Sequence, residues 1–212
     1  HQAHDESVVQ PGAFPADRVI GGWDFAGQRY TPGCTGGVGV VCTSQPRPDG
    51  DPLDPAATDT GPAGHGTHVS SIVAGQLVGD PAAGGIAAGV APGASLVALK
   101  VFGNPVGIQA TTGLSALGID WVVRHNLAVA AGHPTMDVNG APPQPVHVIN
   151  LSLGSDWGPT LSVFNDVVDR VIESGATVVA SAGNDGSRPY ITGSPAASEH
   201  ALSVANSYSP GE

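Results

Sequence analysis

Hydrophobic positions in this chain form short continuous runs and longer stretches with helical spacing. The continuous runs predict strands, because a buried parallel strand is apolar along its whole length. One such run, at 18–25, carries a Gly21-Gly22 kink. The other runs occupy residues 95–101, 146–153, 176–180 and 201–205.

Three further stretches space their apolar residues three and four positions apart, which predicts helices. They cover residues 66–77, 111–131 and 160–174. A threonine at 111 or 112 is the expected cap of the second helix, Thr160 is that of the third, and Gly175 ends the third. The apolar face of the second helix is expected to carry Leu114, Leu117, Trp121 and Arg124.

Strands and helices that alternate in this way predict an α/β domain with a mainly parallel sheet. In such sheets the ligand site lies beyond the carboxyl ends of the strands. Two glycine-containing segments follow predicted strands there: Ser152-Leu153-Gly154 and Ser181-Ala182-Gly183-Asn184-Asp185-Gly186. These two segments are therefore candidates for a binding site.

Composition and charge narrow the class of protein. The 212 residues suffice for one large domain, or most of one, and 41% of them are hydrophobic. Seven Lys and Arg residues against 18 Asp and Glu residues give a formal net charge of −11. We expect no nucleic-acid binding without a basic patch, and no apolar run reaches the length of a membrane span.

Two loop regions interrupt the pattern, at residues 27–63 and 132–145. The first contains Cys34 and Cys42, which would form a small disulfide loop in a secreted protein; two free thiols are the alternative. A solvated acidic loop is the main expectation for its aspartates, and calcium binding is an alternative that no regular ligand spacing supports. These aspartates are Asp49, Asp51, Asp54 and Asp59.

His65 is the main candidate for chemistry, because it stands between Gly64 and Gly66 at the start of a predicted helix. Flanking glycines leave room for partners to reach a histidine that acts as a general base. His68 lies three positions further on, which raises zinc as an alternative. The helical zinc signature, however, has its histidines four apart with a glutamate between them. We expect no zinc here, and we expect His68 to be packed and hydrogen-bonded.

Asn184 is the second candidate, since it follows a predicted buried strand and lies between Gly183 and Asp185. An asparagine in that position is commonly a turn former. It can equally aim its side-chain amide at an oxyanion that develops during a reaction. The residues alone leave both interpretations open.

Taken in order, these segments resemble the subtilisin-like serine proteases (subtilases, the peptidase S8 family). Residues 64–69 with Ala74-Gly75 look like the family's histidine signature, and Gly89-Val90-Ala91-Pro92 before 96–101 looks like the segment that follows it. Residues 148–154 look like the substrate-binding strand, and 182–186 look like the oxyanion-asparagine segment. Residues 18–25 are similar to the stretch between the family's aspartate and histidine motifs.

The resemblance implies a three-layer α/β fold with a mainly parallel central sheet, as one partial peptidase domain over residues 1–212 with loop insertions at 27–63 and 132–145. It implies that His65 takes the proton of a nucleophilic serine and that Asn184 donates to the oxyanion. Residues Ser152, Leu153 and Gly154 would bind substrate as an added strand and form one pocket wall. Residues Ser181, Ala182 and Gly183 would form the facing wall, and such small residues suggest a pocket open to sizeable apolar side chains.

The sequence departs from the family pattern at two members of the triad. No serine has the Gly-Thr-Ser context of the nucleophile, and Asp59-Thr60-Gly61 follows no apolar strand and lies only six residues before His65. We therefore expect an internal fragment that lacks the aspartate and serine motifs, with the sheet incomplete and the 212 residues inactive alone.

The expected parent is a secreted, monomeric serine endopeptidase that acts on proteins or peptides and requires no cofactor. The alternative is a pseudoprotease, a non-catalytic module that binds peptides on the same fold. Neither expectation includes a membrane span or a nucleic-acid partner.

Overall fold

The structure, a computed structural model, describes residues 18–27, 29–35, 42–53, 64–103, 112–133, 144–158 and 163–207. The chain divides into two compact units, and each has its own parallel sheet. The first unit comprises His1–Gly118 and Thr135–Pro142, and the second comprises Ile119–Pro134 and Pro143–Glu212. That the chain is one partial domain with two loop insertions stays a prediction.

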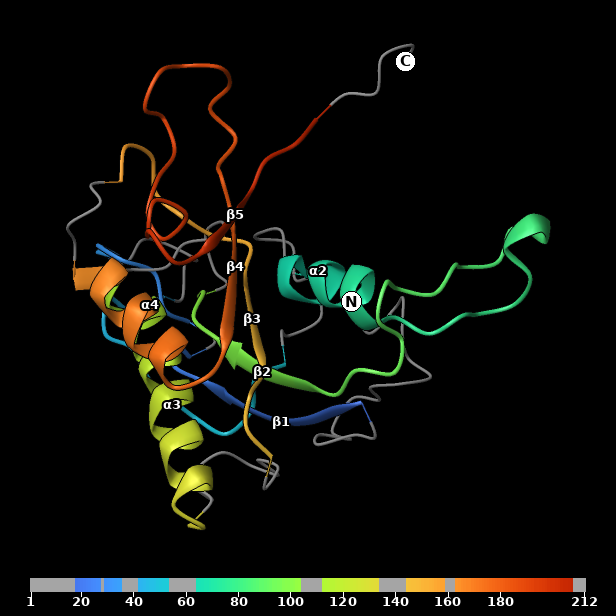
Figure 1. The fold of residues 1–212 in the computed structure, drawn as a ribbon, viewed down its shortest axis with the longest axis horizontal. Helices are drawn as coiled ribbons and strands as arrows, with labels where there is room; N and C mark the ends of the chain where they lie inside the picture. The colour runs from blue at the N-terminus through green and yellow to red at the C-terminus, as the bar shows by residue number, and fades with distance from the viewer. Residues whose placement is uncertain are drawn as a thin grey trace. The chain divides into compact units, whose positions relative to one another are not determined.

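The sheet of the first unit pairs β1 (Val19–Asp24) with β2 (Leu96–Lys100) in parallel, shown blue and green in Figure 1. Both strands were predicted. The pairing register shifts between Val19 and Gly21, where the sequence predicted a kink. Gly22 is required by packing, because a Cβ atom there would overlap the carbonyl oxygen of Ala98.

Helix α2 (His65–Ala74) lies in the same unit and ends three residues before the predicted boundary at Leu77. The hydrogen bonds that the carbonyl groups at its C-terminal end accept account for where the helix stops. The backbone N–H groups of Gly89, Val90 and Ala91 donate to the carbonyls of Gly75, Ile72 and Val73 at 2.9, 3.0 and 2.7 Å. A helix end leaves such carbonyls without intrahelical partners, so the 89–91 segment satisfies them. A 3₁₀ turn, η1 (Pro81–Ala83), lies between the two segments.

Helix α3 (Thr112–Ala130) has nearly the predicted bounds, but its buried face differs from the prediction. Leu114 and Trp121 are buried as expected, whereas Leu117 is 49% exposed and Arg124 is exposed and pairs with Asp120. The buried face continues instead through Ile119, Val122, His125 and Asn126. At about 100° per residue, Leu117 and Arg124 lie at one edge of this face rather than at its centre.

The second unit contains a three-stranded parallel sheet in the order β3-β4-β5. Its strands are β3 (Val148–Leu151), β4 (Thr177–Ser181) and β5 (Leu202–Val204), all at predicted runs. Helix α4 (Val163–Glu173) buries Phe164, Val167, Val168 and Val171. The predicted terminator Gly175 has φ +98°, a left-handed conformation that ends helices, while the predicted cap Thr160 lies outside the described residues.

Two side chains of α3 hold the segment that leads into β3. The amide of Asn126 donates to the carbonyl of Val146 and accepts from its N–H, at 2.9 and 2.8 Å. His125 is fully buried, stacks on Trp121 with ring centroids 4.8 Å apart, and lies 2.9 Å from the carbonyl of Gln144. The start of β3 is thus fixed by paired hydrogen bonds from the helix.

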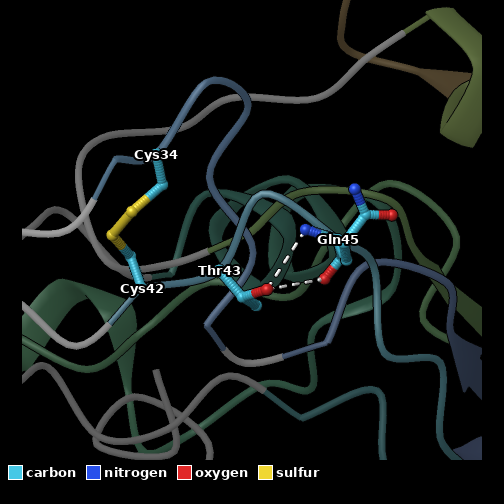
Figure 2. Close-up of a disulfide and its surroundings, with 4 residues drawn as sticks. All are labelled: Cys34, Cys42, Thr43 and Gln45. Atoms are coloured by element: carbon cyan, nitrogen blue, oxygen red, sulfur yellow. Dashed lines mark hydrogen bonds between the residues drawn. A yellow bond between two sulfur atoms is a disulfide. The ribbon is translucent and has the colours of Figure 1, made fainter.

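Cys34 and Cys42 form a disulfide, with Cα atoms 6.2 Å apart, which confirms the bonded alternative (Figure 2). The pairing of Tyr30 with Thr43 lies beside the bond, and the N–H of Thr43 donates to the carbonyl of Arg29 at 2.8 Å. The hydroxyl of Thr43 accepts from the N–H of Gln45 at 3.1 Å, which forms the turn drawn in Figure 2.

Candidate active site

His65 is the first residue of α2. The residue before it, Gly64, has a backbone conformation that favours glycine. Gly64 is buried and has φ +99°, a conformation that a residue with a Cβ atom rarely adopts. Gly66 is different, because no described atom other than its chain neighbours and the nearby helix backbone lies within 4 Å of the position its Cβ would take. The first glycine thus has a conformational role, and the second leaves open space beside His65.

The imidazole of His65 is half-buried and contacts Phe102, which follows β2. The two rings meet edge to face, with centroids 6.2 Å apart and planes at 75°. Among the residues that the structure describes, no hydrogen-bond partner of this imidazole is found. A ring that is held from one side and has no described partner at its nitrogens is suited to take a proton from an incoming group.

His68 does not have the packed side chain that the sequence predicted. It is exposed, its backbone N–H donates to the carbonyl of Gly64, and its carbonyl accepts from the hydroxyl of Ser71 at 2.7 Å. Three residues fall only about 60° short of a full helical turn, so the two histidines lie on neighbouring parts of the helix surface. Among the described residues, the ring contact with Phe102 is made by His65. His65 is thus the histidine of the pair that contacts the strand end.

The carboxyl ends of β1 and β2 carry a buried ion pair that sequence reasoning missed. Asp24 is fully buried, and its Oδ2 lies 2.8 Å from Nζ of Lys100, whose side chain is also buried. The other oxygen, Oδ1, accepts from the N–H groups of Ala26 and Gly27 at 2.8 and 2.7 Å. The sequence signal that could have indicated this pair is Lys100 itself, because a lysine at the end of an apolar run needs a partner of opposite charge.

Burial has the largest effect on the Asp24 carboxyl group and raises its pKa. The hydrogen bond and charge of Lys100, followed by the backbone N–H groups of Gly27 and Ala26, act in the opposite direction. The net direction is upward. Loss of water around this carboxylate therefore outweighs its four favourable interactions.

The two predicted pocket segments leave the sheet of the second unit at the same edge. Leu151 on β3 pairs with Ala180 on β4, so residues 152–154 and 182–184 follow neighbouring strand ends. Asn150 donates to the hydroxyl of Ser152 at 2.9 Å, and the N–H of Ala182 donates to the carbonyl of Val204 at 2.8 Å. The fold thus brings both predicted segments to one edge, and His65 belongs to the other unit.

Asn184 is exposed and follows a glycine in the left-handed conformation, Gly183, with φ +108°. Within the described part of the chain, its side-chain amide has no hydrogen-bond partner. A turn-forming asparagine would bond its own neighbouring backbone. The observed side chain is therefore available to a group outside the described residues.

Asp156 and Asp185 extend the two pocket segments and interact with one another. A hydrogen bond in which protonated Asp156 donates to the Asp185 carboxylate is the largest cause of the raised pKa of Asp156, while the charge of Arg188 acts to lower that pKa. Both carboxyl groups are on exposed residues. Sequence reasoning missed this pair, since neither segment shows by itself that the other lies beside it.

A second loop supports the segment that contains Gly154. The N–H of Ser155 donates to the carbonyl of Ser194 at 3.0 Å, and that of Trp157 to the carbonyl of Ile191 at 3.3 Å. Neither Gly158 nor Gly193 has room for a Cβ atom, because each backbone lies directly against the facing loop. Residues 152–154, the predicted pocket wall, thus have a closely packed support.

The described aspartates of the acidic loop have local structural roles. Asp49 accepts from the N–H of Asp51 at 2.9 Å, and Asp51 accepts from that of Leu53 at 3.1 Å. Asp54 and Asp59 lie outside the described residues. In the ranges that the structure describes, no three His, Cys, Asp or Glu side chains are placed to hold a metal ion together.

Comparisons with known proteins identify the family. The model of the subtilase family matches residues 44–211. Minor extracellular protease Vpr of Bacillus subtilis is 32% identical over 183 residues, which cover 86% of this chain and 17% of Vpr. Subtilisin E of the same organism is 34% identical over 125 residues, which cover 58% of this chain and 25% of that protein.

A solved structure of a protease from Pseudoalteromonas arctica is similar with a TM-score of 0.57 and 25% identity, over 89% of this chain and 50% of that one. The chain belongs to the subtilase family, the subtilisin-like serine proteases, and its fold is an incomplete α/β subtilisin fold. It spans a quarter or less of these curated relatives' length. No helix in the described ranges has the length and apolar character needed to cross a membrane.

Proposed function

We propose that this subtilase is a serine endopeptidase that hydrolyses peptide bonds in proteins. The observation that carries the proposal is the match to the subtilase family over residues 44–211, which includes the histidine, substrate-strand and asparagine motifs in the family's order. The similarity to Vpr, an extracellular protease, supports secretion. Polypeptides are the proposed substrates, and the proposed active form is a monomer that requires no cofactor.

His65 is the proposed general base, which takes the proton of a serine hydroxyl and passes it to the leaving amine. Two observations support this role. Its imidazole has no hydrogen-bond partner among the described residues, and open space lies beside it at Gly66. Phe102 supports one side of the ring, which limits the orientations that the imidazole can take.

Asn184 is the proposed donor to the tetrahedral oxyanion. Its amide is exposed and has no partner among the described residues, which supports this role over that of a turn former. In a subtilisin, loss of such an asparagine lowers turnover by about 10²–10³. We expect a loss of about the same size when Asn184 is replaced by Ala.

Residues 152–154 and 181–183 are the proposed walls of the substrate pocket. They lie at the ends of neighbouring strands of one parallel sheet, and ligands of such sheets bind beyond the strand ends. The serine and aspartate of the triad are proposed to lie outside these 212 residues, because no serine here has the Gly-Thr-Ser context. The 212 residues alone are therefore expected to be inactive.

A fluorophosphonate probe on the full-length protein tests the proposal. We expect labelling of one serine that is lost in His65→Ala and kept in His68→Ala, a matched control with an exposed histidine on the same helix. Labelling that survives His65→Ala would contradict the role of His65.

The second candidate function is a non-catalytic peptide-binding module on the same fold. The missing serine context is the observation that favours it. Absence of serine labelling in the full-length protein, together with saturable binding of an unstructured polypeptide, would support this function over hydrolysis.

A further inference from the structure

A hollow of about 400 Å³ lies in the first unit, lined by residues to which no catalytic or substrate-binding role is assigned above. It lies between the chain that follows β1 and the segment that begins at the disulfide. Three backbone pairings join these two stretches, at Tyr30 with Thr43, Ala26 with Arg47, and Asp24 with Asp49. A volume of this size falls within the range of small-molecule sites.

Two of the seven basic residues of the chain, Arg29 and Arg47, line this hollow. Among the described residues, neither guanidinium group has a hydrogen-bond or ion-pair partner. Three other basic residues do have partners: Lys100 pairs with Asp24, Arg124 pairs with Asp120, and Arg18 donates to backbone carbonyls. Arg29 and Arg47 are exposed, so both guanidinium groups at this hollow are accessible to a ligand from solvent.

The remaining lining indicates the charge and kind of ligand. Asp49 contributes one carboxylate, so the three ionised groups leave one positive charge at the hollow. Cys42 and the methyl group of Thr43, both partly exposed, add apolar surface beside the arginines, whereas Ala26 and Tyr30 in the lining are buried. A planar guanidinium group binds a carboxylate through two parallel hydrogen bonds, and the apolar surface suits an organic group attached to it.

We propose that this hollow binds an organic monocarboxylate through Arg29 and Arg47. A free carboxylic acid and the carboxylate of a peptide share this chemistry. A doubly charged anion fits less well, because Asp49 repels the second charge. The proposal does not rest on peptidase activity, so it can fail or hold independently of the function proposed above.

The backbone gives the two arginines a defined placement. Gly27 has φ +82°, and a Cβ atom there would meet the carbonyl group of Arg47, so the two stretches approach closely. The N–H of Arg47 donates to the carbonyl of Ala26 at 3.0 Å. The disulfide at Cys42, visible in Figure 2, closes the segment on its other side.

Nuclear magnetic resonance of the arginine Nε–H groups can test the proposal on the ¹⁵N-labelled chain, with benzoate as the free carboxylate and benzamide as its neutral analogue. We expect saturable shifts of the Arg29 and Arg47 signals with benzoate and none with benzamide. Raising the salt concentration is expected to weaken binding, because an exposed charge pair is screened. Acetyl-Gly-Gly-Phe with a free C-terminal carboxylate is compared with the same peptide ending in an amide. This comparison tests whether the hollow also binds the carboxylate of a peptide.

Single variants test the two arginines. Arg29→Gln and Arg47→Gln are each expected to weaken benzoate binding at least tenfold, while Arg170→Gln, an exposed arginine on α4, leaves it unchanged. The absence of saturable shifts, equal shifts with benzamide, or equal weakening in Arg170→Gln would overturn the proposal. Should a variant lose its native spectrum, the benzoate and benzamide titrations of the unaltered protein decide the outcome.

Discussion

Asp24 and Lys100 join the carboxyl ends of β1 and β2 through a contact of 2.8 Å between Oδ2 and Nζ, away from water. The N–H of Phe25 also donates to the carbonyl of Lys100 at 2.8 Å. Two residues further on, Phe102 contacts His65. The ion pair thus fixes the strand end that supports the proposed base.

Lys100→Met is expected to lower the free energy of opening of β1 and β2 by about 3–5 kcal/mol, because it leaves a buried carboxylate without its partner. Hydrogen-exchange protection of the amides in both strands measures this change. The double variant Asp24→Asn, Lys100→Met is the control and should recover much of the protection, because the asparagine oxygen can still accept from the N–H groups of Ala26 and Gly27. Equal loss in both variants would mean that packing, rather than uncompensated charge, is the cause.

The pH dependence of Asp24 follows from its raised pKa. The native state takes up a proton at a higher pH than the unfolded chain, whose carboxyl titrates near 3.8, so acidification through this window favours the native state at this residue. The cost of Lys100→Met should accordingly shrink as the pH falls through the pKa of Asp24. Hydrogen exchange at a series of pH values, corrected for intrinsic exchange, checks the sign, and a cost that grows on acidification would contradict it.

Gly64 and Gly66 should respond differently to alanine. Gly64→Ala is expected to destabilise α2 by about 1–2 kcal/mol, because alanine is strained at φ +99°. Gly66→Ala should stabilise the helix by about 0.5–1 kcal/mol, since no described atom obstructs the new methyl group. Hydrogen exchange of the α2 amides measures both effects.

In the full-length protein, Gly66→Ala is also expected to reduce the proposed hydrolysis, because the methyl group occupies space beside His65. Unchanged hydrolysis would indicate that no partner approaches from that side.

Asp185→Asn is expected to lower the pKa of Asp156 toward its ordinary value, because the interaction with Asp185 is the largest cause of the increase. Carboxyl ¹³C chemical shifts followed over pH measure that pKa. Asp166→Asn, on an exposed acidic residue of α4, is the matched control and should leave the titration of Asp156 unchanged.

Replacing both Cys34 and Cys42 by Ser should loosen the pairing of Tyr30 with Thr43. The bond closes a loop with a sequence separation of 8, for which loop entropy alone gives a stabilisation of about 2–3 kcal/mol. Faster exchange of the Thr31 and Thr43 amides, which donate within this pairing, is the expected result. Comparable exchange with and without a reducing agent in the unaltered protein would contradict it.

The sequence predicted all five described strands and three helices, because buried parallel strands and amphipathic helices have distinct apolar spacings. It missed the partner of Lys100, since Asp24 is 76 residues away and no local pattern joins them. The predicted buried face of α3 was wrong in part, because Leu117 and Arg124 lie next to buried positions and not among them. The prediction that the His68 side chain is packed was wrong because the start of a helix need not bury both of its histidines.

The candidate site was predictable in its motifs but not in its surroundings. His65, Asn184 and the two wall segments stand out through their glycine neighbours and their places after strands. The contact of Phe102 with His65, and that of Asp156 with Asp185, depend on how separate segments meet. Their catalytic and binding roles stay predictions that the labelling experiments test.

The segment from Gly89 to Phe102 contacts both ends of α2. Its first residues donate to the helix carbonyls at one end, and Phe102 meets His65 at the other. The distance between these two anchor points must therefore match the length of a helix of 10 residues, about 15 Å at the usual rise. The connection from Ala91 to Phe102 thus ties the C-terminal end of α2 to the residue that supports the imidazole at its N-terminal end.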